Sequence, residues 1–207
     1  MNGILNTSWF HGTQHHIDIE AWAFPPGTHH KPELVAHSAV FLTTDRILAM
    51  GAGGKLYTAN INPSAKVLDL RIPGKESEEF RRVAILGKLG KDHSFAKADY
   101  WSAAWRQGKM MRFASSKPHH IKDQERIMQA KGKYDAGDRS EETIRLMIKG
   151  QNLTRAWIEE IVNAGRKLGY DALIGTEPDT YRPGGAVICE VLFALNANAL
   201  TAPVHVL

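Results

Sequence analysis

The carboxylate Glu190 stands inside a run that is otherwise apolar, Ala186–Leu195. A strand that is apolar on both faces is buried, and an unpaired carboxylate in such a place is strongly unfavourable. Ile188 and Leu192 share the face of Glu190, so a shift of register cannot expose it alone. We therefore expect Glu190 to be buried and to act as a catalytic carboxylate in a pocket. The alternatives are an ion pair with a buried arginine, or exposure on an edge strand.

A histidine and a glycine stand together in the motif Trp9-Phe10-His11-Gly12-Thr13. The motif predicts a strand that ends at His11, whose imidazole could offer a ligand a hydrogen bond. Gly12 has no side chain, so the ligand could approach the backbone closely there. An ordinary turn is the alternative interpretation of a His-Gly-Thr tripeptide.

Short strands and a long helical region would position these residues. Apolar runs bounded by turn residues predict strands at Trp9-Phe10, Ala39–Leu42, Leu56–Ile61, Lys66–Leu70, Tyr170–Gly175 and Ala186–Leu195. Thr44 is the expected N-cap of a short helix, Asp45–Met50, that ends at Gly51. Helical spacing dominates Glu76–Lys167, and Gly169 closes the last helix of that region.

We expect a single α+β domain over residues 1–207, with a helical, basic insertion at about residues 76–167. Of the 207 residues, 43% are apolar and 23% charged, which is the balance of an ordinary globular protein. No apolar run is long enough to span a membrane, and Met1–Thr13 lacks the pattern of a signal peptide. We expect a cytoplasmic protein without a membrane partner. The single cysteine, Cys189, excludes a disulfide within the chain.

Positive charge is concentrated in the segment Phe80–Lys133. The segment holds 13 Lys and Arg against four Asp and Glu, a net charge of +9, whereas the whole chain carries +4. Trp101 and Trp105 alternate there with cations, an arrangement that could stack on a nucleic-acid strand and neutralise it. The expected contacts with such an acceptor are Arg106, Lys109, Arg112 and Lys117. Core packing by the tryptophans beside a solvated basic face is the favoured alternative.

Three adjacent histidine pairs invite a metal interpretation, namely His15-His16, His29-His30 and His119-His120. Adjacent side chains point apart, and no Asp, Glu or His at helical spacing completes a ligand set. We therefore expect no metal site.

Five motifs follow one another in the order His11-Gly12-Thr13, Phe41-Leu42-Thr43-Thr44, the Tyr57 strand that runs into Asn62-Pro63 and Val67-Leu68-Asp69, Gly169-Tyr170-Asp171-Ala172, and the strand with Glu190. Together they resemble the ADP-ribosyltransferase fold. The branch is the His-Tyr-Glu one, shared by diphtheria-toxin-like enzymes and poly(ADP-ribose) polymerases. The resemblance covers about residues 8–70 and 168–200. It implies a split β-sandwich in which the helical, basic middle is an insertion.

The resemblance implies that NAD is the substrate and assigns residues to it. His11 would bind the adenosine ribose by a hydrogen bond, the Gly12 backbone would hold the nicotinamide amide, and Thr13 would add a hydroxyl. Phe41 stands where the family has a tyrosine beside the nicotinamide, and it keeps the stacking face. Thr43, from the same motif, completes the implied binding set.

The other implied residues are Tyr57 and Glu190. A second family tyrosine is missing at Ala49–Ala52, and Tyr57 is the nearest aromatic that could replace it, with a core position as the alternative. Glu190 would bind the 2′-hydroxyl of the nicotinamide ribose and stabilise the positive charge that develops at C1′. Glu190 and His11 are thus the implied catalytic residues. Ile188 stands where related toxins carry Glu or Gln, which disfavours transfer to arginine.

The expected function is NAD-dependent mono-ADP-ribosyl transfer, in which the nicotinamide–ribose bond is cleaved and ADP-ribose passes to a macromolecular acceptor, nucleic acid or protein. Two alternatives stay open. Water could take the place of the acceptor, which would make the protein an NAD glycohydrolase. An inactive transferase fold could instead bind RNA or a protein through the basic segment.

Overall fold

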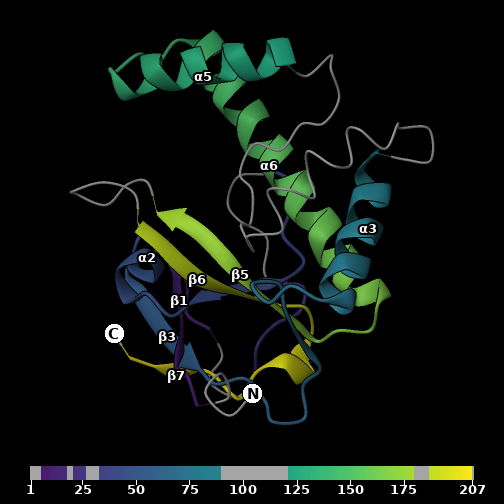
Figure 1. Cartoon of the computed structure of the whole chain (residues 1–207). Coiled ribbons are helices and arrows are strands. Elements are labelled where there is room, and N and C mark those ends of the chain that lie inside the picture. Colours follow the sequence, from purple (N-terminus) through teal and green to yellow (C-terminus); the bar gives the residue numbers. More distant parts are fainter. Residues whose placement is uncertain (1–5, 18–20, 27–32, 90–120, 180–186, 207) are drawn as a thin grey trace.

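The described strands form a seven-stranded mixed sheet in the order β4-β5-β6-β2-β1-β3-β7 (Figure 1). The computed structural model describes residues 6–17, 21–26, 33–89, 121–179 and 187–206. The strands are β1 (Trp9–Thr13), β2 (Val40–Thr43), β3 (Lys55–Ala59), β4 (Val67–Asp69), β5 (Ala172–Asp179), β6 (Val187–Ala194) and β7 (Val204–His205). The helices are α2 (Arg46–Met50), α3 (Lys75–Leu89), α5 (Ile121–Asp135) and α6 (Glu141–Lys167), with a 3₁₀ turn at Ala197–Ala199. The expected α+β class is confirmed.

Strand β6 lies inside the sheet and is paired unequally on its two sides. It pairs with β5 along its whole length, from Val187 opposite Asp179 to Ala194 opposite Ala172. It pairs with β2 only at residues 191–194. The first half of β6 is therefore an edge segment on the side of β2.

The ladder between β1 and β2 is short. These two strands share one register pair, Phe10 with Thr43. By contrast, β1 pairs with β3 at five successive positions, from Trp9 opposite Ala59 to Thr13 opposite Lys55. Beyond Phe10, the sheet is consequently open between β1 and β2.

Each face of the sheet carries its own apolar cluster. On one face, α3 and α6 pack against β4, β5 and β6 through residues such as Phe80, Ile161, Leu173 and Phe193. On the other face, Trp22 and the 3₁₀ segment cover Trp9, Tyr57, Ile174 and Leu192. Side chains alternate along a strand, so Val191 and Phe193 of β6 lie in the first cluster and Leu192 and Ala194 in the second.

Helix α6 links the sheet to α5. It has 27 residues, which corresponds to about 40 Å. Its C-terminal half packs on the sheet, and its N-terminal half meets α5 through Ile127, Ala130 and Leu146. Figure 1 shows α5 at the end of α6 that is remote from the sheet. No helix in the described parts of the chain is long and apolar enough to cross a membrane.

Local capping explains where two helices begin and end. Asp45, and not Thr44 as expected, is the N-cap of α2, because its side chain accepts hydrogen bonds from Ile47 N at 2.9 Å and Leu48 N at 3.0 Å. Gly169 follows the C-terminus of α6 with a φ of 75°, as the sequence predicts.

Candidate functional site

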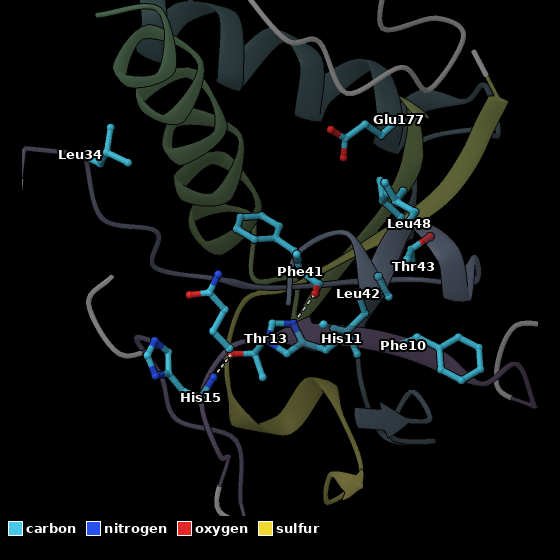
Figure 2. A pocket seen from close by; sticks show the side chains of 15 residues that line it. Phe10, His11, Thr13, His15, Leu34, Phe41, Leu42, Thr43, Leu48 and Glu177 are labelled. Atoms are coloured by element: carbon cyan, nitrogen blue, oxygen red, sulfur yellow. Dashed lines mark hydrogen bonds between the residues drawn. The ribbon is translucent and has the colours of Figure 1, made fainter. Parts of the chain in front are cut away.

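A cavity of about 450 Å³ opens where β1 and β2 separate (Figure 2). Five residues that the sequence assigned to NAD line it, namely His11, Gly12, Thr13, Phe41 and Thr43. They come from two strands more than twenty-five positions apart in the chain, so the fold brings them together. The volume of the cavity is within the range of small-molecule sites, about 300–1,000 Å³.

His11 spans the open part of the sheet. Strand β1 continues through His11 to Thr13 and does not end at the histidine as expected. The His11 Nδ1 atom lies 2.7 Å from the Phe41 carbonyl oxygen. A carbonyl only accepts hydrogen bonds, so Nδ1 carries the proton and the other ring nitrogen, Nε2, is an acceptor. The imidazole also packs edge-on against Trp22, with ring centroids 5.6 Å apart.

The environment of His11 favours its neutral form. Burial lowers the pKa of His11, and the hydrogen bond to the Phe41 carbonyl opposes that change with a smaller effect. At neutral pH the ring is therefore a hydrogen-bonding group without charge. A ribose hydroxyl is the kind of donor that Nε2 could accept.

Gly12 is required for packing between β1 and α2. A Cβ atom at Gly12 would lie 1.7 Å from the Ala49 carbonyl oxygen, which is the backbone of α2. Gly53 is equally tight, since its Cβ would lie 2.1 Å from the Thr13 carbonyl carbon. The expectation that Gly12 leaves open space for a ligand is wrong on this side, because α2 fills that space.

Phe41 and Thr43 line the cavity from β2. The Phe41 ring packs edge-on against Phe193, with centroids 4.7 Å apart. The Thr43 hydroxyl donates to the Glu190 carbonyl oxygen at 2.6 Å and accepts from Asp45 N at 3.1 Å. Its one proton is thus already used, and it can offer a ligand only an acceptor lone pair.

Tyr57 lies in the core and does not line the cavity. Its side chain is 1% exposed and belongs to the cluster around Trp22. Its hydroxyl oxygen accepts a hydrogen bond from Ile17 N at 3.1 Å and lies 3.2 Å from His16 Nδ1. The core alternative therefore describes its position.

Glu190 is half exposed, so the expectation of burial is wrong. Its side chain is 47% exposed and forms an ion pair with Arg71. The apolar cluster around Trp22 includes Leu192 and Ala194 of β6 but stops short of Glu190, so its side chain lies beyond the covered part of that face. Ile188 is likewise exposed, whereas Cys189 between them is buried. Glu190 thus combines exposure with an ion pair, but its partner Arg71 is only partly buried, and β6 is not an edge strand.

Glu190 and His11 face the same side of the sheet. Glu190 is two residues from Leu192, and His11 is opposite Tyr57; both of these neighbours belong to the cluster around Trp22. Strands β6 and β1, which carry the two residues, flank β2 on either side. Glu190 does not line the cavity, but its carbonyl oxygen holds the cavity residue Thr43.

The sequence interpretation missed Arg71 and Glu177. Arg71 follows β4 and reaches Glu190, 119 positions away in the chain. Glu177 extends toward the cavity from β5 (Figure 2). It was missed because the predicted strand ended at Gly175, whereas β5 continues to Asp179.

The expected contacts with a nucleic-acid acceptor, Arg106, Lys109, Arg112 and Lys117, lie outside the described residues. At the described ends of the basic segment several cations have partners within the protein. Arg81 is 4% exposed and donates to the Leu70 carbonyl oxygen at 3.1 Å, and Arg82 forms an ion pair with Glu79. Within the described ranges, no group of three or more His, Cys, Asp or Glu is arranged to hold a metal ion.

Comparisons with known proteins add little to this description of the site. No protein-family model matches the chain, and no curated protein matches it. Among solved structures, the chain is similar to a protein described as an anti-CRISPR protein, with a TM-score of 0.41 and 12% sequence identity over 98% of each chain. At that level of similarity the match identifies neither fold family nor function.

Proposed function

We propose that the protein is an NAD-dependent mono-ADP-ribosyltransferase. The observation that carries this proposal is the convergence of His11, Gly12, Thr13, Phe41 and Thr43 on one cavity. The sequence resemblance assigns these five residues to NAD. In this proposal the fold is of the ADP-ribosyltransferase type, and the opening between β1 and β2 corresponds to the split of its sandwich.

The polar groups of the site match what NAD would require. Nε2 of neutral His11 can accept a hydrogen bond from the adenosine ribose, and the Phe41 ring offers an aromatic edge to the nicotinamide. Glu190 lies outside the cavity and faces the side of the sheet that His11 shares with Tyr57, whereas Phe41 faces the side of Phe193. Its carboxylate can bind the 2′-hydroxyl of the second ribose and stabilise positive charge at C1′.

The reaction itself is a substitution at C1′ of the nicotinamide ribose. The bond from C1′ to the nicotinamide nitrogen breaks, and its electron pair stays with nicotinamide, which leaves as a neutral molecule. An acceptor lone pair then forms the new bond to C1′, and the acceptor loses its proton to solvent. A carboxylate beside C1′ accelerates this step because the positive charge is largest in the transition state.

The acceptor is a macromolecule in this proposal, and the basic segment Phe80–Lys133 favours nucleic acid over protein. Its net charge of +9 would attract a polyanion, in contrast to the negative remainder of the chain. NAD glycohydrolysis is the second candidate, because the same cavity and carboxylate would serve water as the acceptor.

The test uses NAD labelled in the adenine ring together with a cell lysate. We expect the purified protein to release free nicotinamide and to transfer label to material that a nuclease or a protease degrades. Nicotinamide without transferred label would identify a glycohydrolase. If nicotinamide is not released with or without lysate, the enzyme proposal is wrong and the binding module is favoured.

Two variants make the test specific for the site. Glu190→Gln keeps the shape of the side chain and removes its charge, so we expect nicotinamide release to fall to the background. Glu79→Gln is the matched control, since Glu79 also forms an exposed ion pair with an arginine, on α3 away from the cavity. It should retain full activity. Full activity of Glu190→Gln would contradict the catalytic assignment.

A further inference from the structure

We propose that Asp69 and Arg71 are positioning residues for Glu190, which they hold in place without cancelling its charge. This inference rests on the proposed function, because it concerns the carboxylate that the reaction uses. Nothing in the sequence pattern links these three residues. The structure brings them together across the strand order β4-β5-β6.

Asp69 fixes the Arg71 side chain by several hydrogen bonds. Arg71 Nε donates to Asp69 Oδ1 at 2.8 Å, and Arg71 Nη2 donates to Asp69 Oδ2 at 2.6 Å. The Arg71 backbone N–H also donates to Oδ1 at 3.0 Å, which closes a local turn. This bidentate arrangement leaves Nη1 as the outward end of a rigid fork.

The outward end of the fork binds Glu190. Arg71 Nη1 donates to Glu190 Oε1, and the Arg71 side chain crosses β5 to do so. Asp69 and Arg71 are much less exposed than Glu190, at 11% and 24% against 47%. The supporting pair is thus shielded from water, whereas the carboxylate that it supports is accessible.

Asp69, Arg71 and Glu190 together carry one net negative charge, which is available to the reaction. Asp69 neutralises Arg71, and the hydrogen bond to Asp69 is the main cause that raises the pKa of Arg71. Arg71 therefore stays charged, and the carboxylate of Asp69 balances that charge. Glu190 Oε2 accepts no hydrogen bond from the described residues, so it stays available for a ribose hydroxyl. A lone arginine would orient Glu190 equally well but would oppose the positive charge at C1′.

This arrangement predicts how the three residues depend on one another. Loss of Arg71 frees the Glu190 side chain to rotate, and loss of Asp69 leaves Arg71 to neutralise Glu190. Either change should lower kcat by about 10- to 100-fold, the usual effect of a misplaced catalytic group. Because both act through the same carboxylate, their effects should not multiply when the two changes are combined.

The experiment measures NAD cleavage by Arg71→Gln, Asp69→Asn and the double variant, with Glu190→Gln as the variant that lacks the carboxylate. The binding constant for NAD is measured for each by calorimetry. We expect kcat to fall while NAD affinity stays within about twofold, because the other proposed contacts of NAD, in the cavity, are unchanged. The double variant should lose about as much as either single one. Arg71→Lys should retain part of the activity, since it keeps the charge but not the fork.

Arg82→Gln is the matched control, because it breaks an exposed arginine–carboxylate pair on α3. It should leave kcat and NAD affinity unchanged. Melting temperatures of all variants show whether a lower rate reflects unfolding.

The outcomes separate this inference from the proposed function. If Glu190→Gln abolishes cleavage while Arg71→Gln and Asp69→Asn keep full kcat, the proposed function stands and the positioning role is wrong. Multiplicative losses in the double variant would also overturn it, since they mean that Asp69 and Arg71 do not act through one shared group. If the unmodified protein does not cleave NAD, both proposals fail.

Discussion

Gly12 leaves no room for even the smallest side chain. Gly12→Ala would place a methyl group against the Ala49 carbonyl oxygen and push α2 away from β1. We expect the free energy of unfolding in urea to fall by about 1–3 kcal/mol, as overpacking usually causes. NAD binding should weaken with it, because Leu48 and Ala49 line the cavity.

The control for this change is Gly54→Ala. A Cβ at Gly54 meets nothing within 4 Å, and its φ is not in the left-handed region. Its stability should match that of the unmodified protein. Equal stability of Gly12→Ala would show that α2 does not lie against β1 in solution.

The burial of His11 makes stability depend on pH. Its pKa in the folded protein is lowered from the ordinary value of 6.5. Above that value the ring is neutral in both states. As the pH falls below it, the unfolded chain binds a proton that the folded protein resists, so stability is lost down to the lowered pKa.

We therefore expect the melting temperature to decrease as the pH falls below about 6.5, and His11→Gln to flatten that decrease. The glutamine amide can still donate to the Phe41 carbonyl. His15→Gln changes an exposed histidine of the same strand end and should leave the decrease unaltered. Parallel curves for all three proteins would contradict the burial of His11.

Arg166 joins α6 to the sheet at two strands. It donates to the Ser38 carbonyl oxygen at 2.6 Å, just before β2, and to the Leu195 carbonyl oxygen at 2.7 Å, just after β6. Arg166→Met keeps the aliphatic stem and removes these bonds. We expect a loss of about 1–3 kcal/mol, the range for hydrogen bonds to a charged group.

Thermal or urea unfolding measures this loss, and Lys167→Met is the control. Lys167 is the next residue, is exposed, and also ends α6. A loss for Lys167→Met as large as that for Arg166→Met would mean that charge at the helix terminus, and not the contact with the strands, stabilises α6.

Sequence signals that act over a few residues predicted the helices and strands well. Gly169 marks the end of α6 because a left-handed backbone favours glycine, and that preference is visible in the sequence. The exposure of Glu190 was not visible. It depends on where the apolar cluster on that face of the sheet ends, and a run of apolar residues is the same whether one or both faces of the strand are covered.

The candidate site was predictable only for residues in motifs whose order along the chain indicates that they lie close together in the fold. His11 and Phe41 carry recognisable motifs, so their convergence on the cavity was expected. Arg71 has no signal, since an arginine two residues after an aspartate is common in turns and nothing indicates its partner 119 positions away. Gly12 was singled out correctly, but its reason is the close approach of α2.

The distribution of charge over the whole chain predicts how an acceptor would bind. If the basic segment docks a nucleic acid, replacing Lys109, Arg112 and Lys117 by Glu should reduce modification of that acceptor and its dependence on salt. NAD cleavage without acceptor should hardly change, because no residue assigned to NAD lies in the segment.

The matched control replaces three exposed lysines outside the segment, Lys75, Lys149 and Lys167, by Glu. It changes the net charge by the same amount. Rates of label transfer at increasing salt distinguish the two triple variants. Equal loss with both would mean that total charge, and not the segment, attracts the acceptor.

The central place of β6 has a consequence during synthesis of the chain. β6 follows all strands of the sheet except β7, yet it lies between β5 and β2. Until the ribosome has released it, both of these neighbours present unpaired backbone groups, which are templates for association with other chains. Glu190 is also absent until β6 has been synthesised. A nascent chain therefore carries its greatest tendency to aggregate while it still lacks the carboxylate, and both conditions end when one strand is inserted.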